Sequence, residues 1–145
     1  MLRKEHPDHH DAELVLRLYD LRREGLMRES RAAISAKYWP RNEDEALAIL
    51  KSDHPLNPAF RQVVTYWEMV YGLVKWDVLH GDFMLESSGE GLLVYAKAEP
   101  YLAQIRARGN PTYFVNAEWV ATNIEAGRRT LERYRARVQR VLESR

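Results

Sequence analysis

The chain has 145 residues, no cysteine and nearly balanced charge, with 22 lysines and arginines against 21 aspartates and glutamates and a net charge of +1. This length predicts one domain that can bury its own core. Without cysteine there is no thiolate nucleophile, no cysteine-ligated metal and no disulfide, which fits a reducing compartment. The small net charge argues against attraction of the whole protein to nucleic acid or to an anionic membrane.

Apolar residues recur at intervals of three and four along nearly the whole chain, which indicates helices. The first helix is expected to begin after Asp8 and to stop at Gly25. Asp8 is an N-cap residue, and the carboxylate of Asp11 suits the positive end of the helix. The predicted buried face carries Leu14, Leu18 and Leu21.

Three further helices are expected before residue 81. A short one covers about residues 29–38. The next begins at Asn42, with Glu45 three residues later in a pattern similar to a capping box. The fourth begins at Asn57 and runs to about His80, and its wide apolar arc marks it as the central core helix.

Residues 81–91 are expected to form a polar loop, followed by a fifth helix over residues 92–108. Pro100 should break that helix, because proline removes a backbone donor and clashes with the preceding turn. A sixth helix is expected to begin at Thr112 or Asn116 and to continue to the C-terminus.

These elements predict the all-α class: a single-domain bundle of five to six helices covering residues 1–145. Residues 1–10 are expected to be flexible, and residues 112–145 to form a long basic C-terminal helix. If it spans some thirty residues, this helix would be about 45 Å long.

The most apolar stretch, residues 63–79, contains Glu68, Lys75 and Asp77, so it does not predict a membrane span. The first eleven residues also lack the apolar region of a secretory signal, and we therefore expect a cytoplasmic protein. Glu68 follows two aromatic residues but falls on the polar side of its helix, so a solvated or ion-paired carboxylate is favoured over a catalytic one.

The densest group of possible metal ligands lies at the N-terminus, where His6, His9 and His10 are interspersed with Asp8 and Asp11. Imidazoles and carboxylates together can bind a divalent transition metal. However, Pro7 interrupts the helical spacing of the histidines, so a frayed polar terminus is the favoured interpretation. The alternative is a metal-dependent hydrolase built on this cluster.

The segment Ser87-Ser88-Gly89-Glu90-Gly91 resembles a phosphate cradle because it leads into a helix. It lacks the lysine and the spacing of a P-loop, and Glu90 would repel a phosphate. The sequence therefore predicts no cofactor. Trp67, Tyr71 and Trp76 could line a pocket for a small apolar ligand, although core packing explains them equally well.

The C-terminal segment is strongly basic, since residues 128–145 carry seven arginines against two glutamates. Its predicted basic patch consists of Arg128, Arg129, Arg133, Arg137 and Arg140. The same segment continues a seam of apolar residues spaced by three and four, which form the candidate interface. These are Ile124, Leu131, Tyr134, Val138 and Val141.

Three interpretations of this helix stay open. The seam can close the protein's own bundle. It can pair with a second copy of the chain. The arginines can dock on nucleic acid or on an acidic partner, with nucleic acid the least favoured, because no recognised DNA-binding motif accompanies them.

Several segments carry a family resemblance: residues 18–23 and 27–31, residues 60–69, and residues 89–101. Through them the chain resembles a bacterial family of small helical proteins classed as a domain of unknown function. The resemblance covers most of residues 14–108 and implies an all-helical domain, without supplying catalytic residues. Some relatives carry a membrane-spanning segment ahead of the domain, which is not carried over to this chain.

The sequence as a whole favours a non-enzymatic module that works through protein–protein contacts and forms a homodimer through its C-terminal helix. The metal-dependent hydrolase and the nucleic-acid-binding module are the alternatives.

Overall fold

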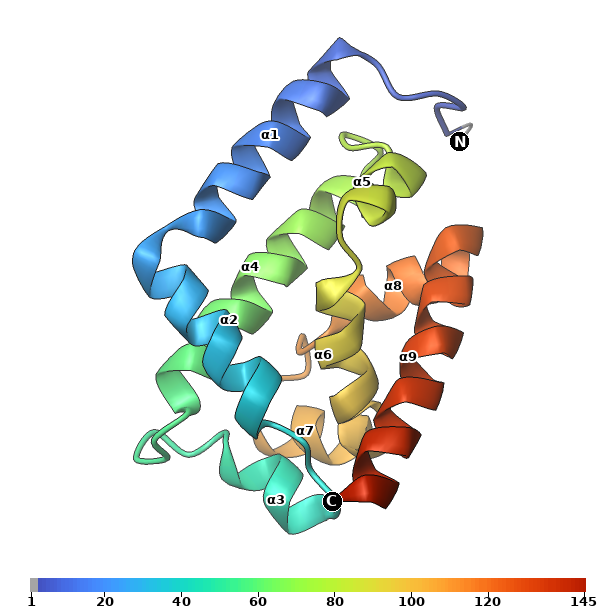
Figure 1. Ribbon diagram of the computed structural model, residues 1–145. Helices are drawn as coiled ribbons and strands as arrows, with labels where there is room; N and C mark the ends of the chain where they lie inside the picture. The colour runs from blue at the N-terminus through green and yellow to red at the C-terminus, as the bar shows by residue number, and fades with distance from the viewer. Residues whose placement is uncertain (1–2) are drawn as a thin grey trace.

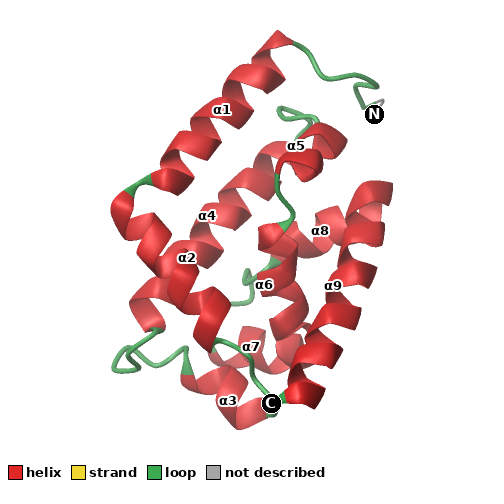
Figure 2. Cartoon of the chain, in the orientation of Figure 1, coloured by secondary structure: helices red, strands yellow, loops and turns green. Residues whose placement is uncertain are grey.

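The computed structural model describes residues 3–145, and this part of the chain is helical with no strand. Figures 1 and 2 show helices packed around α4 and α6, with the last helix, α9, along one side of the molecule. The elements are α1 (His9–Arg23), α2 (Gly25–Lys37), α3 (Glu43–Ala48), α4 (Asn57–Lys75), α5 (Gly81–Ser87), α6 (Glu90–Ala98), the 3-10 turn Glu99–Tyr101, α7 (Leu102–Arg108), α8 (Val115–Asn123) and α9 (Glu125–Ser144). The all-α class and the single domain with a long C-terminal helix are confirmed.

Helix α4 is central, as its apolar arc predicts, because it packs against α2, α6 and α8. Phe60, Val70 and Tyr71 are fully buried. The ring of Phe60 lies edge-on to Tyr38 at 5.2 Å between centroids, which joins α4 to the residue that ends α2. The core is therefore built from α4 and the faces of α2, α6 and α8 that pack against it.

The first helix begins at the predicted cap. The side chain of Asp8 accepts from the Asp11 N–H at 3.1 Å, and Asp11 accepts from the Asp8 N–H at 2.8 Å, so the two aspartates form a capping box. The predicted stop at Gly25 is wrong, because α1 ends at Arg23. The break falls at Glu24, whose carboxylate caps α2, and Gly25 begins that helix.

The expected loop over residues 81–91 is also wrong in part, because residues 81–87 form α5. His80 caps this helix through Nδ1, which accepts from the Phe83 N–H at 3.1 Å. Helix α4 ends at Lys75 rather than near His80, and Asp77 in the connection adopts a left-handed conformation with φ of 59°. A histidine cap is a weak sequence signal, since aspartate, asparagine and serine dominate at that position.

The predicted break at Pro100 is confirmed, since α6 ends at Ala98 and α7 begins at Leu102. The prediction of a single helix over residues 112–145 is wrong. The chain is extended at Ile124, so α8 and α9 are separate helices, and α9 is about 30 Å long instead of 45 Å. Gly127 allows α9 to cross α8 closely, because a Cβ there would overlap the Val120 carbonyl.

The N-terminal segment lies against the connection between α4 and α5. Arg3 donates to the Lys75 carbonyl at 3.2 Å, and the backbone N–H of Lys4 donates to Asp77 at 3.1 Å. Residues 3 and 4, which belong to the segment expected to be flexible, therefore make specific contacts. The flexibility of this segment stays a prediction. Within residues 3–145, no helix has both the length and the apolar character needed to cross a membrane.

Candidate functional site

The apolar seam of α9 packs against the protein's own core. Leu131 is buried, and Ile124, Tyr134 and Val138 are partly buried against the core. Val141 is half-buried near the end of the helix. This arrangement supports the interpretation in which the seam closes the protein's own bundle.

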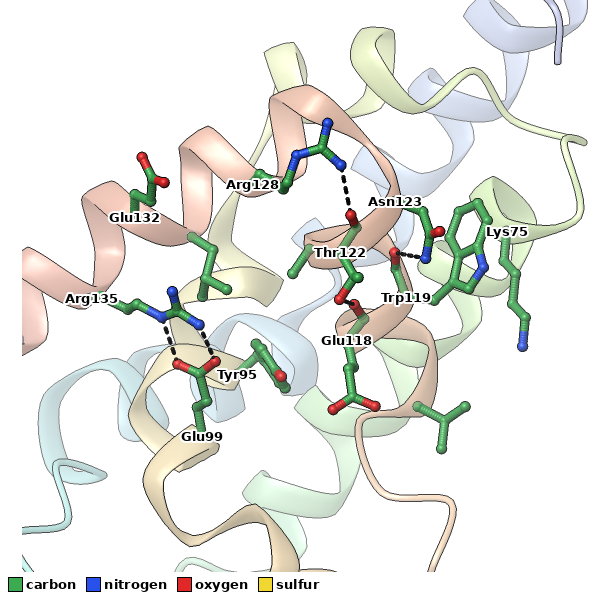
Figure 3. A pocket seen from close by; sticks show the side chains of 13 residues that line it. Lys75, Tyr95, Glu99, Glu118, Trp119, Thr122, Asn123, Arg128, Glu132 and Arg135 are labelled. Carbon is green, nitrogen blue, oxygen red and sulfur yellow. Dashed lines mark hydrogen bonds and ion pairs between the residues drawn. The ribbon is translucent and has the colours of Figure 1, made fainter.

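All five arginines of the predicted basic patch are exposed on α9, and some of them have partners within the chain. Arg128 lines a groove of about 720 Å³ between α6, α8 and α9 (Figure 3). Arg129 forms an ion pair with Glu125 one turn earlier, at 2.9 Å. Arg133 donates to the Thr130 hydroxyl at 3.3 Å. The remaining two, Arg137 and Arg140, are exposed, and Arg137 also borders a separate cavity.

Several charged groups of the groove in Figure 3 have partners inside the protein. Arg135 forms a bidentate pair with Glu99 at 2.8 and 2.5 Å, and Arg128 donates to the Thr122 carbonyl at 2.6 Å. Burial, assisted by the negative charges of Glu99 and Glu118, raises the pKa of Tyr95 at the floor of the groove to about 12. This tyrosine is therefore neutral at physiological pH.

The predicted metal cluster is not assembled. His6, His9 and His10 are exposed, and His9 lies 3.5 Å from Glu13 on its own helix. Asp11 is turned inwards and fully buried. Across residues 3–145, no three histidine, cysteine, aspartate or glutamate side chains are placed to hold a metal ion together.

Glu68 has a structural role that the helical wheel does not reveal. It is partly buried, and its carboxylate accepts from the N–H groups of Asn116 and Ala117 at 2.8 and 3.0 Å. Burial raises its pKa, although these two donors act in the opposite direction. Glu68 thus holds the first turn of α8 against α4, whereas the sequence predicts a solvated or ion-paired carboxylate.

The three aromatic residues considered for an apolar pocket are not together. Trp67 and Tyr71 are buried and stack at 5.8 Å between centroids, whereas Trp76 is 73% exposed. Core packing explains the first two residues.

A different apolar surface lies where α1, α2 and α4 meet. Leu21, Met27, Tyr66 and Met69 line a groove of about 390 Å³. Leu21 is 50% exposed and Met69 is 47% exposed. The Tyr66 hydroxyl donates to the Leu18 carbonyl at 2.6 Å and fixes α1 against α4 beneath the groove. Leu21 was predicted to face the core, but it lies at the edge of the buried face.

Glu24 stands at the end of this groove. Its carboxylate accepts from the N–H groups of Leu26 and Met27, both at 3.1 Å. These hydrogen bonds lower its pKa, so the carboxylate stays ionised over the physiological range. The groove therefore combines apolar walls with a fixed negative charge.

The fold and these surfaces define an all-helical domain whose exposed apolar groove lies on α1, α2 and α4. The chain belongs to the family DUF4760, a domain of unknown function, whose model matches residues 7–124. This match confirms the resemblance to a domain of unknown function, and it extends from α1 to the break before α9. Neither the curated proteins nor the solved structures compared with the chain gave a match.

Proposed function

We propose that the protein is a non-enzymatic interaction module that forms a homodimer through the groove between α1, α2 and α4. The observation that carries this proposal is the exposure of Leu21 and Met69, from α1 and α4, in the lining of an apolar groove. Large apolar side chains gathered on a surface favour association, because contact with a partner removes them from water. We place this function in the cytoplasm, where a chain without cysteine is unaffected by reducing conditions.

The charges beside the groove suit a second copy of the same chain. Arg17 is exposed and lies one turn before Leu21, and Glu24, which lines the groove, lies about one turn after it. A two-fold axis close to Leu21 would set two α1 helices antiparallel. In that arrangement Arg17 of each copy lies near Glu24 of the other, and the two Leu21 side chains meet at the centre.

Replacing Leu21 with aspartate is expected to weaken the dimer at least about thirtyfold, because each interface loses a central apolar contact and gains two charges. The solution mass, measured by light scattering over a concentration series, should fall to that of a monomer. Leu16→Asp is the matched control, since Leu16 is 66% exposed on the same helix and does not line the groove. A wild-type protein that is monomeric throughout the series would overturn the proposal.

Arg17→Glu tests the antiparallel arrangement separately. It places a negative charge near Glu24 of the other copy, so the dimer should weaken, most strongly at low salt. Unchanged dimerisation in this variant, together with loss of the dimer in Leu21→Asp, would keep the groove as the interface but reject the antiparallel pairing.

A further inference from the structure

A small polar cavity lies between α2, α6 and α9, and its lining shares no residue with the groove of the proposed interface. Its volume is about 260 Å³, and each of the three helices contributes a basic side chain to its lining. These are Arg31 from α2, Lys97 from α6 and Arg137 from α9. Hydroxyl groups accompany them, from Ser35, Ser88 and Tyr134.

Lys97 is the unusual member of this set, because only 2% of it is exposed. Its ammonium donates to the Ile34 carbonyl at 3.2 Å, near the negative end of α2, and lies 3.9 Å from the centre of the Trp39 ring. Among residues 3–145, no carboxylate forms an ion pair with it. A buried ammonium with three donors has therefore only one hydrogen-bonded acceptor.

The charges around the cavity leave a positive excess. Glu90 is its acidic lining residue, and its carboxylate is paired with Arg31 at 2.8 Å. Lys97 and Arg137 are then left without a negative partner within the cavity. Burial, with a further contribution from Arg137 and Arg145 that exceeds the opposing effect of Glu90, lowers the pKa of Lys97 to about 7. A bound anion would relieve this repulsion and favour the charged amine.

The start of α6 also borders the cavity, where the Ser88 hydroxyl accepts from the Glu90 N–H at 3.3 Å. Ser88 and Gly89 line the cavity, and the glycine N-cap of α6 makes no side-chain capping hydrogen bond. The sequence alone argued against a phosphate site here because the segment lacks the lysine of a P-loop and contains Glu90. The structure brings Lys97 from two turns further along the same helix and pairs Glu90 with Arg31.

We propose that this cavity binds the phosphate group of a small phosphorylated molecule. Several cationic donors and hydroxyls converge from three helices, which suits a dianion with at least three acceptor oxygens better than a single carboxylate. The volume admits a phosphate group with a small substituent and excludes larger ligands such as dinucleotides. Arg31 and Arg137 lie at the accessible edge, and Lys97 forms the buried end of the site.

Titration with inorganic phosphate tests this assignment. Phosphate is expected to raise the melting temperature and to give a saturable heat signal in calorimetry at constant ionic strength, whereas chloride does neither. Acetate measures the carboxylate alternative under the same conditions. Equal binding of acetate would overturn the phosphate assignment, and the absence of a saturable phosphate signal would overturn the site.

Variants locate the binding. Lys97→Met and Arg137→Gln should each weaken phosphate binding at least tenfold, while Arg140→Gln should leave it unchanged, because Arg140 is exposed on the same helix and does not line the cavity. Loss of binding in Arg140→Gln alone, or unchanged binding in both cavity variants, would show that phosphate attaches to the arginine-rich surface of α9 and reject the proposal. The dimer groove lies on other residues, so Leu21→Asp should bind phosphate as the wild type does.

Discussion

Replacing Lys97 with methionine is expected to make the unliganded protein more stable, by about 2 kcal/mol in the free energy of unfolding at pH 7. The lowering of the Lys97 pKa from 10.5 to about 7 corresponds to on the order of 4 kcal/mol against the charged amine. Methionine fills similar space without a charge, but it gives up the contacts with the Ile34 carbonyl and the Trp39 ring, which offset part of the gain.

The gain should depend on pH. Between pH 7 and 10.5 the unfolded chain keeps a proton on Lys97 that the folded chain has released, so this residue makes the wild type more stable as the pH rises through that range. Lys97→Met lacks this component, and its advantage should therefore shrink from pH 6 towards pH 9. Above about pH 10 tyrosine ionisation also contributes, because burial raises the pKa of Tyr95 and Tyr71.

Urea unfolding followed by circular dichroism at several pH values between 6 and 9 measures the effect. Lys37→Met is the matched control, since Lys37 is exposed in the last turn of α2, and it should show neither the gain nor its pH dependence. A Lys97→Met variant that is less stable than the wild type at pH 6 would mean that the amine is compensated within the folded protein. Stabilisation together with loss of phosphate binding would show that the site is maintained at a cost to the fold.

The burial of Lys97 could have been predicted from the sequence. Residues 91–98 contain one charged side chain among glycine, alanine, leucine, valine and tyrosine, so no polar face exists on which it could reach water. A helix that is apolar on all sides is buried, and a lysine within it is buried as well. The other cavity residues come from α2 and α9, and no local pattern indicates that those helices meet there.

The helical class, the central α4 and the break at Pro100 followed from local rules, because periodicity and proline geometry depend only on near neighbours. The break at Ile124 did not follow from such local rules. No proline or strong capping residue marks it, and the extended conformation there accompanies the packing of α9 back against α8 and α6. The apolar seam was recognised correctly, but its partner could not be identified from spacing alone.

The apolar groove was missed for a related reason. A helical wheel places Leu21 within the apolar arc of α1 but does not show that α2 and α4 leave that edge uncovered. Glu68 was assigned to solvent on the same grounds, whereas α8 covers it. In both cases the helix was predicted correctly, but the neighbouring helices that cover or expose the residue were not predicted.

Asp11→Ala is expected to destabilise the protein by about 3 kcal/mol, because Asp11 is fully buried and accepts three hydrogen bonds. They come from the backbone N–H of Asp8 at 2.8 Å, the backbone N–H of His80 at 2.8 Å and the ammonium of Lys4 at 2.8 Å. Alanine leaves all three donors without this acceptor. It also separates the start of α1 from the connection that leads into α5.

The Asp11 carboxylate also sets an acid limit on stability. Burial alone raises its pKa, but the hydrogen bonds from Lys4, Asp8 and His80 outweigh burial and lower the pKa from 3.8 to about 2. A depressed pKa contributes stability above the unfolded value, here about 2 kcal/mol, and this contribution is lost as the pH falls from 3.8 towards 2. The difference between the wild type and Asp11→Ala should therefore narrow over that interval.

Urea unfolding at pH 7, 5, 3.5 and 2.5 measures both parts of this prediction, with Glu13→Ala as the control because Glu13 is exposed on the same helix. Asp11→Asn separates charge from hydrogen bonding. Its amide oxygen can still accept from His80, but its amino group would face the N–H of Asp8 or the ammonium of Lys4, so it should lose about 2 kcal/mol. An Asp11→Ala variant as stable as Glu13→Ala would show that neither the contacts of Asp11 with Lys4 and His80 nor its part in the capping box holds α1 in place.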